Sequence, residues 1–211
     1  LATLVTGFGE SGFRIQDEIE NLSASPAQVQ MLYHFNVGVP LLDAGSQLVA
    51  PSSSVVPRNA HAAEAIDSYR DYRGEEAGFQ EQVYFHRLHA AGNGQTRVLL
   101  KNAHASAGVS LLYDAIKLPC FSQWKNTTAV PDGYVTGIEP GTNFPNPRSF
   151  EGDQGRVLEL SGGARAALEL GVEWHRSAAS VKAAEVAVAK LQSGRPPKMF
   201  RTPQPGWCAD V

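Results

Sequence analysis

The chain has 211 residues, of which 43% are hydrophobic and 18% charged, and its formal net charge at pH 7 is −3. This composition supports one domain with a sizeable core, and the acidic balance gives no basic field that would hold nucleic acid. Cys120 and Cys208 are too few for a disulfide framework, and no apolar run approaches the ~20 residues of a membrane span. We therefore expect a cytoplasmic protein with reduced thiols and no membrane or nucleic-acid partner.

The first patterned segment is a strand. Phe13, Ile15 and Ile19 alternate with charged or amide side chains, which is typical of a half-buried strand. The preceding segment, residues 7–12, spells the glycine pattern of a dinucleotide-binding loop. That motif requires a helix next and an acidic residue roughly 20 positions later. A strand follows instead, and no Asp or Glu occurs between Glu20 and Asp43. We therefore interpret residues 9–12 as a hairpin turn and expect no NAD site.

Alternation of apolar and polar residues dominates the rest of the chain. It continues from Val29 through Met31 into a strand over residues 33–42, and Leu168, Leu170, Val172 and Trp174 share one face of the last strand. Turn residues between such runs predict hairpins. The remaining predicted elements are a hairpin of residues 83–85 and 97–100 around 91–94, a strand over 109–113, and a hairpin of 156–160 and 166–175 around 161–163.

Helical signals are few. Residues 59–72 predict a short helix capped by Asn59, and residues 180–192 predict a helix that ends at Gly194. The apolar stripe of this second helix consists of Val181, Ala184, Val188 and Leu191. Residues 195–211 contain four prolines and are expected to be irregular. Many short strands joined by turns predict an all-β fold, an antiparallel β-sandwich or barrel with one or two short helices.

Neither a metal site nor an activated nucleophile is indicated. His86 and His89 are separated by an odd number of positions, so on a strand they face opposite sides and cannot chelate one ion together. No nucleophile-elbow motif and no phosphate-binding loop occurs. We expect no catalytic metal and no cofactor.

Two polar residues stand out within apolar segments, and they suggest a general acid/base pair. Glu139 follows the strand formers Val135 and Ile138, and we expect Pro140 and Gly141 to end that strand in a rigid loop. A carboxylate held in this way suits a positioned base. His34 lies in the predicted strand 33–42. If the two act across a sugar ring, we expect a separation of about 5–10 Å. The alternatives are a core histidine bonded to a carbonyl and a carboxylate that caps backbone N–H groups.

Aromatic side chains near these residues suggest a sugar site. A flat ring beside polar groups is a common way to present an apolar face to a sugar. Trp124, Lys125 and Asn126 combine a ring, a cation and an amide, and they are candidates for a pocket edge or for a surface loop.

Four segments together resemble the aldose 1-epimerase-like family, in its uncharacterised bacterial branch within the galactose mutarotase superfamily. They are residues 33–43, 81–86, 123–126 and 137–146, and they occur in the order of the family. The resemblance implies a galactose mutarotase-like supersandwich with a sugar cleft on one sheet. It also implies that His34 is the general acid and Glu139 the general base. Glu81 stands where the family has a substrate-binding Asp, and the family's N-terminal Arg and second His have no counterpart here.

The resemblance implies an enzyme that interconverts sugar anomers without metal or cofactor. The partner would be a monosaccharide or sugar derivative. The alternatives are a non-catalytic carbohydrate-binding protein of the same fold and a sugar-phosphate epimerase. The residues expected to bind substrate are Asn36, Glu81, Trp124, Lys125, Asn143 and Arg148.

The resemblance also bears on domain organisation. Residues 1–211 would form a single domain that lacks its N-terminal part, with a helix and an irregular tail over residues 176–211. Strand edges left unpaired by the missing part would favour a homo-oligomer.

Overall fold

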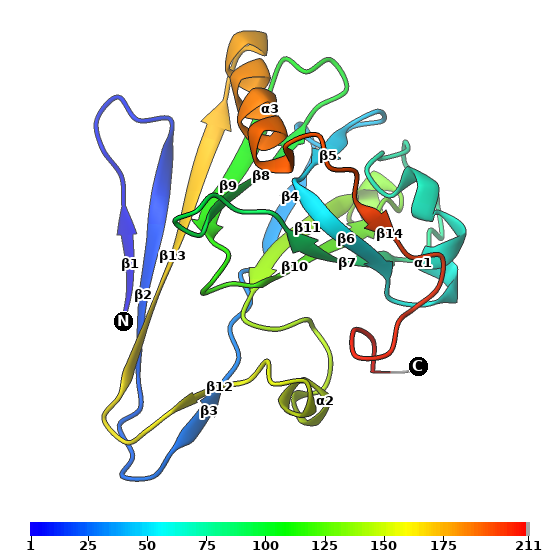
Figure 1. Ribbon diagram of the computed structural model, residues 1–211. Helices are drawn as coiled ribbons and strands as arrows, with labels where there is room; N and C mark the ends of the chain where they lie inside the picture. The colour runs from blue at the N-terminus through cyan, green and yellow to red at the C-terminus, as the bar shows by residue number, and fades with distance from the viewer. Residues whose placement is uncertain (210–211) are drawn as a thin grey trace.

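Two six-stranded sheets lie face to face in the computed structural model, which describes residues 1–209 (Figure 1). The first sheet has the strand order β1-β2-β13-β9-β8-β5 and the second β14-β6-β7-β10-β11-β4, while β3 and β12 pair separately. All pairings are antiparallel except that of β14 with β6. The strands are β1 Ala2–Val5, β2 Gly12–Glu20, β3 Ala27–Val29, β4 Phe35–Gly38, β5 Gln47–Val49, β6 Ser52–Pro57, β7 Gln82–Leu88, β8 Gln95–Lys101, β9 Gly108–Asp114, β10 Cys120–Asn126, β11 Val135–Gly141, β12 Leu158–Leu160, β13 Arg165–His175 and β14 Lys198–Met199. The predicted antiparallel β-sandwich is confirmed.

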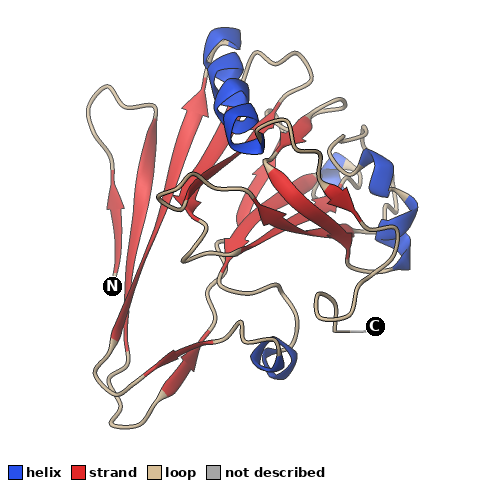
Figure 2. Cartoon of the chain, in the orientation of Figure 1, coloured by secondary structure: helices blue, strands red, loops and turns tan. Residues whose placement is uncertain are grey.

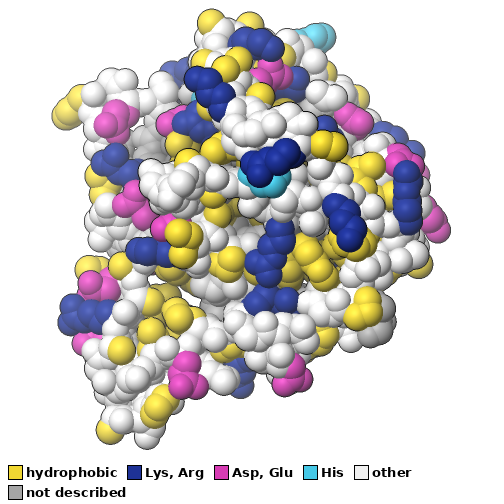
Figure 3. All heavy atoms as spheres, in the orientation of Figure 1, with side chains coloured by type: hydrophobic (Ala, Val, Ile, Leu, Met, Phe, Trp, Pro, Cys, Tyr) yellow, Lys and Arg dark blue, Asp and Glu magenta, His cyan; other side chains and the backbone are white. Residues whose placement is uncertain are grey.

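Alternation along the strands creates the core between the sheets. Leu168, Leu170 and Val172 of β13 point inward from the first sheet, where they meet Phe121 and Ile138 of the second. Glu169 and Glu173 alternate with them and face outward, as the period of two requires. On the surface shown in Figure 3, acidic and basic side chains are interspersed with apolar ones.

A separate apolar cluster covers part of the outer face of the second sheet. Phe144 lies between Phe85 and Trp207, with ring centroids 4.6 and 5.2 Å away. Phe200 and Cys208 of the C-terminal segment also pack here. The tail thus lies against the sheet, and its only regular element within the described residues is β14. The remainder of this outer face holds the candidate site described below.

The α-helices lie at the periphery of the sheets (Figure 2). Within residues 1–209 they are α1 Ala60–Glu64, α2 Arg148–Asp153 and α3 Ala178–Gln192. The Asn59 side chain caps α1 by accepting from the Ala62 N–H, as predicted. Helix α3 buries Val181, Ala184 and Val188 against Leu99 of β8. No helix in the described part of the chain is long and apolar enough to cross a membrane.

Two predictions made near the N-terminus, the first hairpin turn and the strand over residues 33–42, have different outcomes in the structure. Strands β1 and β2 pair antiparallel around residues 6–11, so the turn predicted in place of a dinucleotide loop is confirmed. The strand predicted over residues 33–42 is shorter, since β4 comprises only Phe35–Gly38.

The other two predicted hairpins are wrong. Strands β7 and β8 belong to different sheets, so residues 89–94 cross from one layer of the sandwich to the other. Strand β12 pairs with β3, while β13 pairs with β2 and β9. Turn residues fix where a strand ends. They do not fix whether the next strand returns alongside it, because pairing depends on which faces must be buried.

Pro140 and Gly141 do not end β11, contrary to expectation. Both remain in register with β10, opposite Phe121 and Cys120. Proline removes a hydrogen-bond donor on one side of a strand only. That side faces the segment before β4, where the Tyr33 N–H donates to the Pro140 carbonyl at 2.9 Å. Glu139 therefore lies within a strand and not at its end.

Candidate functional site

His34 and Glu139 lie opposite each other on neighbouring chain segments of the second sheet. The pairs Phe35–Ile138 and Leu32–Gly141 on either side keep one register, which places these two residues across from one another. Directly opposed residues on a sheet project their side chains to the same face. The His34 Nε2 atom is 3.0 Å from Glu139 Oε1, and the exposed fractions of the two side chains are 48% and 3%.

Pro140 explains why His34 stands out from the strand. Without an N–H, Pro140 cannot donate to the Tyr33 carbonyl. That carbonyl accepts instead from the N–H of Phe35, at 3.0 Å, which closes a three-residue turn with His34 at its centre. The ladder between β4 and β11 is interrupted at this point, and the imidazole is left half-exposed above the buried carboxylate.

The direct contact corrects the expected separation. At 3.0 Å, no sugar ring fits between His34 and Glu139, whereas about 5–10 Å was expected for groups acting from two sides of the ring. The expectation assumed a substrate sandwiched between the residues, but cross-strand neighbours on one face are held side by side. A ligand of this pair must therefore approach both groups from the open side of the sheet.

The carboxylate of Glu139 is buried against its own strand. A Cβ atom at Gly137 would lie 2.2 Å from Glu139 Oε1, so the carboxylate occupies the space that any other residue at 137 would fill. The hydroxyl of Ser122, which lies opposite Glu139 on β10, has no hydrogen-bond partner among the described residues, and Glu139 Oε1 has no close polar contact there besides the His34 ring. Burial raises the pKa of Glu139 to about 7, the nearby His34 lowers it, and Glu81 raises it further.

Trp124 and Asn36 extend the site on the same face. Both are paired with Gly137, Trp124 from β10 and Asn36 from β4. The indole meets the His34 ring edge to face, with centroids 5.6 Å apart and planes at 63°. The indole Nε1 donates to Glu81 Oε2 at 2.7 Å. The structure thus brings together five of the predicted residues: His34, Asn36, Glu81, Trp124 and Glu139.

The other three predicted residues lie differently. Lys125 faces the opposite side of β10, where its ammonium donates to the Asp71 carbonyl at 2.7 Å and lies 5.1 Å from the centre of the Tyr72 ring. Burial there lowers the pKa of Lys125 to about 8. The alternation of a strand turns neighbours of Trp124 to the other face. Asn143 is buried and donates to the carbonyl of Phe144, and Arg148 is exposed on α2.

Gly137 and Ser122 are the site residues that the sequence patterns missed. Gly137 lies two positions before Glu139, a spacing that places both on one face of a strand. That spacing was a usable signal, since a glycine inside a strand often marks a close approach. Ser122 has no comparable signal, because only the register between β10 and β11 brings it opposite Glu139.

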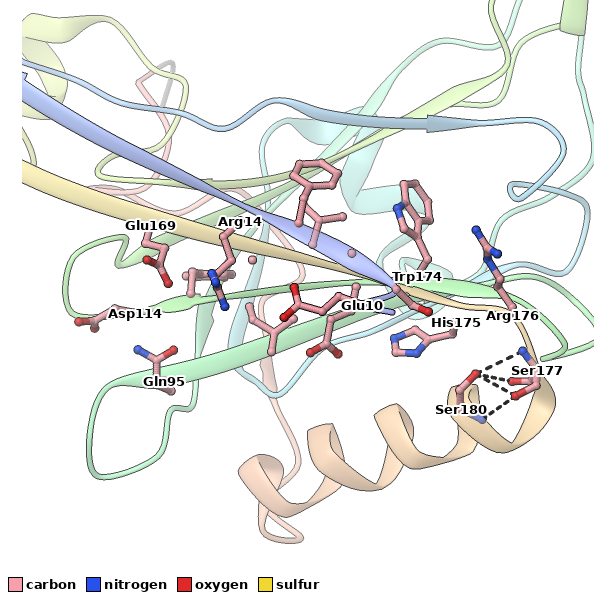
Figure 4. Close-up of a pocket in the computed structure, with 18 of the residues that line it drawn as sticks. Glu10, Arg14, Gln95, Asp114, Glu169, Trp174, His175, Arg176, Ser177 and Ser180 are labelled. Carbon is pink, nitrogen blue, oxygen red and sulfur yellow. Dashed lines mark hydrogen bonds between the residues drawn. The ribbon is translucent and has the colours of Figure 1, made fainter. Parts of the chain in front are cut away.

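A separate hollow of about 1010 Å³ lies on the far face of the first sheet (Figure 4). It is bounded by the β1–β2 loop and α3, and contains neither His34 nor Glu139. Three of its lining residues bond to side chains outside the lining: Glu169 with Gln16 at 2.8 Å, Glu173 with Arg97 at 2.9 Å, and His175 with Ser110 at 2.8 Å. Within residues 1–209, no three His, Cys, Asp or Glu side chains are grouped so as to hold a metal ion. The candidate site is therefore the His34–Glu139 face.

Comparison with known proteins identifies a family for this chain and solved structures with a similar fold. The model of a domain of unknown function, DUF4432, matches residues 2–174. A crystal structure described as a "putative aldose 1-epimerase" from Klebsiella pneumoniae is 35% identical, with a TM-score of 0.93 over 96% of this chain and 53% of that one. The chain thus spans about half the length of that relative. No curated protein matches at a significant level.

More distant solved structures share the fold alone. A galactose mutarotase-like protein from Clostridium acetobutylicum is 13% identical, with a TM-score of 0.53 over 79% of this chain and 53% of that one. A galactose mutarotase-like protein from Lactobacillus casei is 16% identical, with a TM-score of 0.51 over 82% and 62% of the two chains. The architecture is therefore that of galactose mutarotase-like β-sandwiches.

Proposed function

The chain belongs to the DUF4432 family, and from this premise we propose that it is an aldose 1-epimerase, with Glu139 as general base and His34 as general acid. The observation that carries the proposal is the 3.0 Å contact between a half-exposed imidazole and a buried carboxylate on one face of the sheet. The resemblance to the Klebsiella protein and the mutarotase-like fold support it.

The chemistry of anomer exchange suits two groups in contact. Glu139 takes the proton of the anomeric hydroxyl, the bond between the anomeric carbon and the ring oxygen breaks, and His34 gives a proton to that oxygen. The carbonyl rotates, and the reverse transfers close the ring on the other face. Both reacting oxygens are bonded to the same carbon, so neighbouring groups can serve them from one side. Positioned acids and bases each contribute about 10²–10⁴-fold.

The acidity of Glu139 supports its role as the base. A pKa of about 7, raised by burial, places a base near the pH at which it operates. His34 covers the Oε1 atom of this carboxylate. We infer that the anomeric hydroxyl reaches the carboxylate by taking over the position of the imidazole nitrogen, which then turns toward the ring oxygen.

The surrounding residues favour an uncharged monosaccharide. Trp124 offers a ring and Asn36 an exposed amide on the same face. A sugar phosphate would call for cationic side chains beside the pair. Of the two cations predicted to bind substrate, Lys125 faces the other side of the sheet and Arg148 is exposed on α2. The sugar-phosphate alternative is therefore not favoured.

The experiment is anomer exchange measured by polarimetry and by saturation-transfer NMR on a panel of freshly dissolved monosaccharides. We expect the purified protein to accelerate the approach to anomeric equilibrium for at least one sugar, and the double variant His34→Ala/Glu139→Gln not to. Sugar binding without acceleration by the wild-type chain would contradict the epimerase and indicate a carbohydrate-binding protein.

A further inference from the structure

A charged hydrogen bond ties the indole of Trp124 to the start of a neighbouring strand. Trp124 Nε1 donates to Glu81 Oε2 at 2.7 Å. Glu81 immediately precedes β7, which pairs with β10 through Lys125 and Gln82. Hydrogen bonds to an ionised acceptor are shorter and stronger than neutral ones. The one N–H donor of the indole is thereby committed to a protein group.

The anchored ring reaches across a strand to the candidate acid. Trp124 is paired with Gly137, which has no side chain, so the indole meets no β-carbon on β11. Beyond that strand the ring contacts His34, with centroids 5.6 Å apart. The contacts therefore run in order from Glu81 to Trp124, from Trp124 to His34, and from His34 to Glu139, over four adjacent segments of one sheet face.

We propose that Glu81 is a positioning residue, which holds the indole of Trp124 against His34 and thereby keeps the imidazole beside Glu139. The inference rests on the proposed function, and it assigns Glu81 a role other than the direct sugar contact expected from the sequence. The imidazole needs such support because it is half-exposed and stands in a tight turn outside the strand ladder.

The same contact defines what the indole offers to a ligand. Because its N–H is already bonded to Glu81, Trp124 presents only the carbon face and edge of its ring. Such a surface favours the C–H face of a sugar over a ligand that seeks a donor. We infer that this edge of the site contacts an apolar patch of the substrate ring.

The first test is spectroscopic and needs no activity. The chain has three tryptophans, so a ¹⁵N spectrum contains three indole N–H signals, and Trp124→Phe identifies that of Trp124. In Glu81→Gln we expect this signal to move upfield, and in Glu81→Ala we expect the His34 ring protons to lose the shift caused by the indole. Glu159→Gln, an exposed glutamate on β12, is the matched control. Unchanged signals in both Glu81 variants would overturn the proposal.

The second test is a double-mutant cycle on kcat and KM. Misplacing a catalytic group by about 1 Å costs up to ~10²-fold, so we expect Glu81→Ala and Trp124→Phe each to lower kcat by roughly ten- to a hundredfold. The double variant should be no worse than Trp124→Phe, and Glu81→Gln, which keeps an acceptor, should retain most of the activity. Losses that multiply would show that Glu81 contacts the sugar independently and would overturn the proposal. If the wild-type protein exchanges no anomers, the proposed function fails, and the spectra alone decide the positioning contact.

Discussion

His34, which immediately precedes β4, faces Glu139 of β11, and their side chains are in contact at 3.0 Å from Nε2 to Oε1. One partner is half-exposed and the other almost fully buried. The register and the missing N–H of Pro140 together produce this asymmetry: the imidazole is turned outward, while the carboxylate opposite it is folded inward over Gly137.

The carboxylate of Glu139 is expected to be essential for turnover. Glu139→Gln keeps the shape of the side chain but cannot accept a proton, so kcat should fall by at least about 10²-fold. Sugar binding, measured by isothermal titration calorimetry, should remain largely intact. Glu159→Gln serves as the surface control. Wild-type turnover in Glu139→Gln would show that another group is the base.

The rate should depend on pH through Glu139. The base acts in its ionised form, and its pKa is raised to about 7, so kcat/KM should rise as the pH increases from 5 to 8, with a midpoint near 7. A pH series of anomer-exchange rates measures this midpoint. A midpoint near the ordinary value of 4.5 would contradict the burial that raises this pKa.

The stabilising contribution of Glu139 should decrease with increasing pH, whereas the rate should increase. Because the pKa of Glu139 is higher in the folded state than its ordinary value of 4.5, the native state binds the proton more tightly. The contribution of Glu139 to the free energy of unfolding is therefore present in full below about pH 4.5 and is lost as the pH rises through about 7. Urea titrations of wild type and Glu139→Gln should diverge over this range, with the variant gaining relative stability at higher pH. A difference that stays constant between pH 4 and 8 would argue against the raised pKa.

Gly137 should be required for the position of the carboxylate. In Gly137→Ala the new Cβ would lie 2.2 Å from Glu139 Oε1, so the carboxylate must move. We expect kcat to fall by up to about 10²-fold while the fold is kept. Circular dichroism monitors the fold and anomer exchange the rate.

Gly171→Ala is the matched control for that experiment. Gly171 lies on β13 of the first sheet, and a Cβ atom there would have Leu112 Cβ as its nearest atom, at an acceptable 3.4 Å. Equal losses in the two variants would mean that the Gly137 effect is a general cost of alanine in these sheets.

The aromatic stack should anchor the C-terminal segment beside the site. Phe144 is fully buried between Phe85 and Trp207, so Phe144→Ala should lower the free energy of unfolding by about 3–5 kcal/mol. Ile116→Ala, at a side chain that is 75% exposed, should change it by less than about 0.5 kcal/mol. Chemical denaturation measures both, and a loss in Phe144→Ala no larger than in the control would contradict the role of the stack.

The sequence by itself determined the class of fold and the identity of the pair. Alternation of apolar and polar residues predicts half-buried strands wherever it occurs, since the side-chain period of a strand is two. The helix ends are equally local: Asn59 caps α1 as expected, and α3 ends just before Gly194, although its C-cap is Ser193, with a positive φ of 51°. His34 and Glu139 were recognisable because each is a polar residue in an apolar segment of a familiar motif.

Only the tertiary structure decided which strands pair and where the side chains meet. Strands β7 and β8 look like a hairpin but belong to opposite layers, because a strand pairs with whichever neighbour buries its apolar face. The inclusion of Ser122 follows from the register between β10 and β11, which places it opposite Glu139. A register is set by contacts between residues distant in sequence. The same contacts brought the imidazole and the carboxylate to 3.0 Å, because two strands far apart in the chain lie side by side in the sheet.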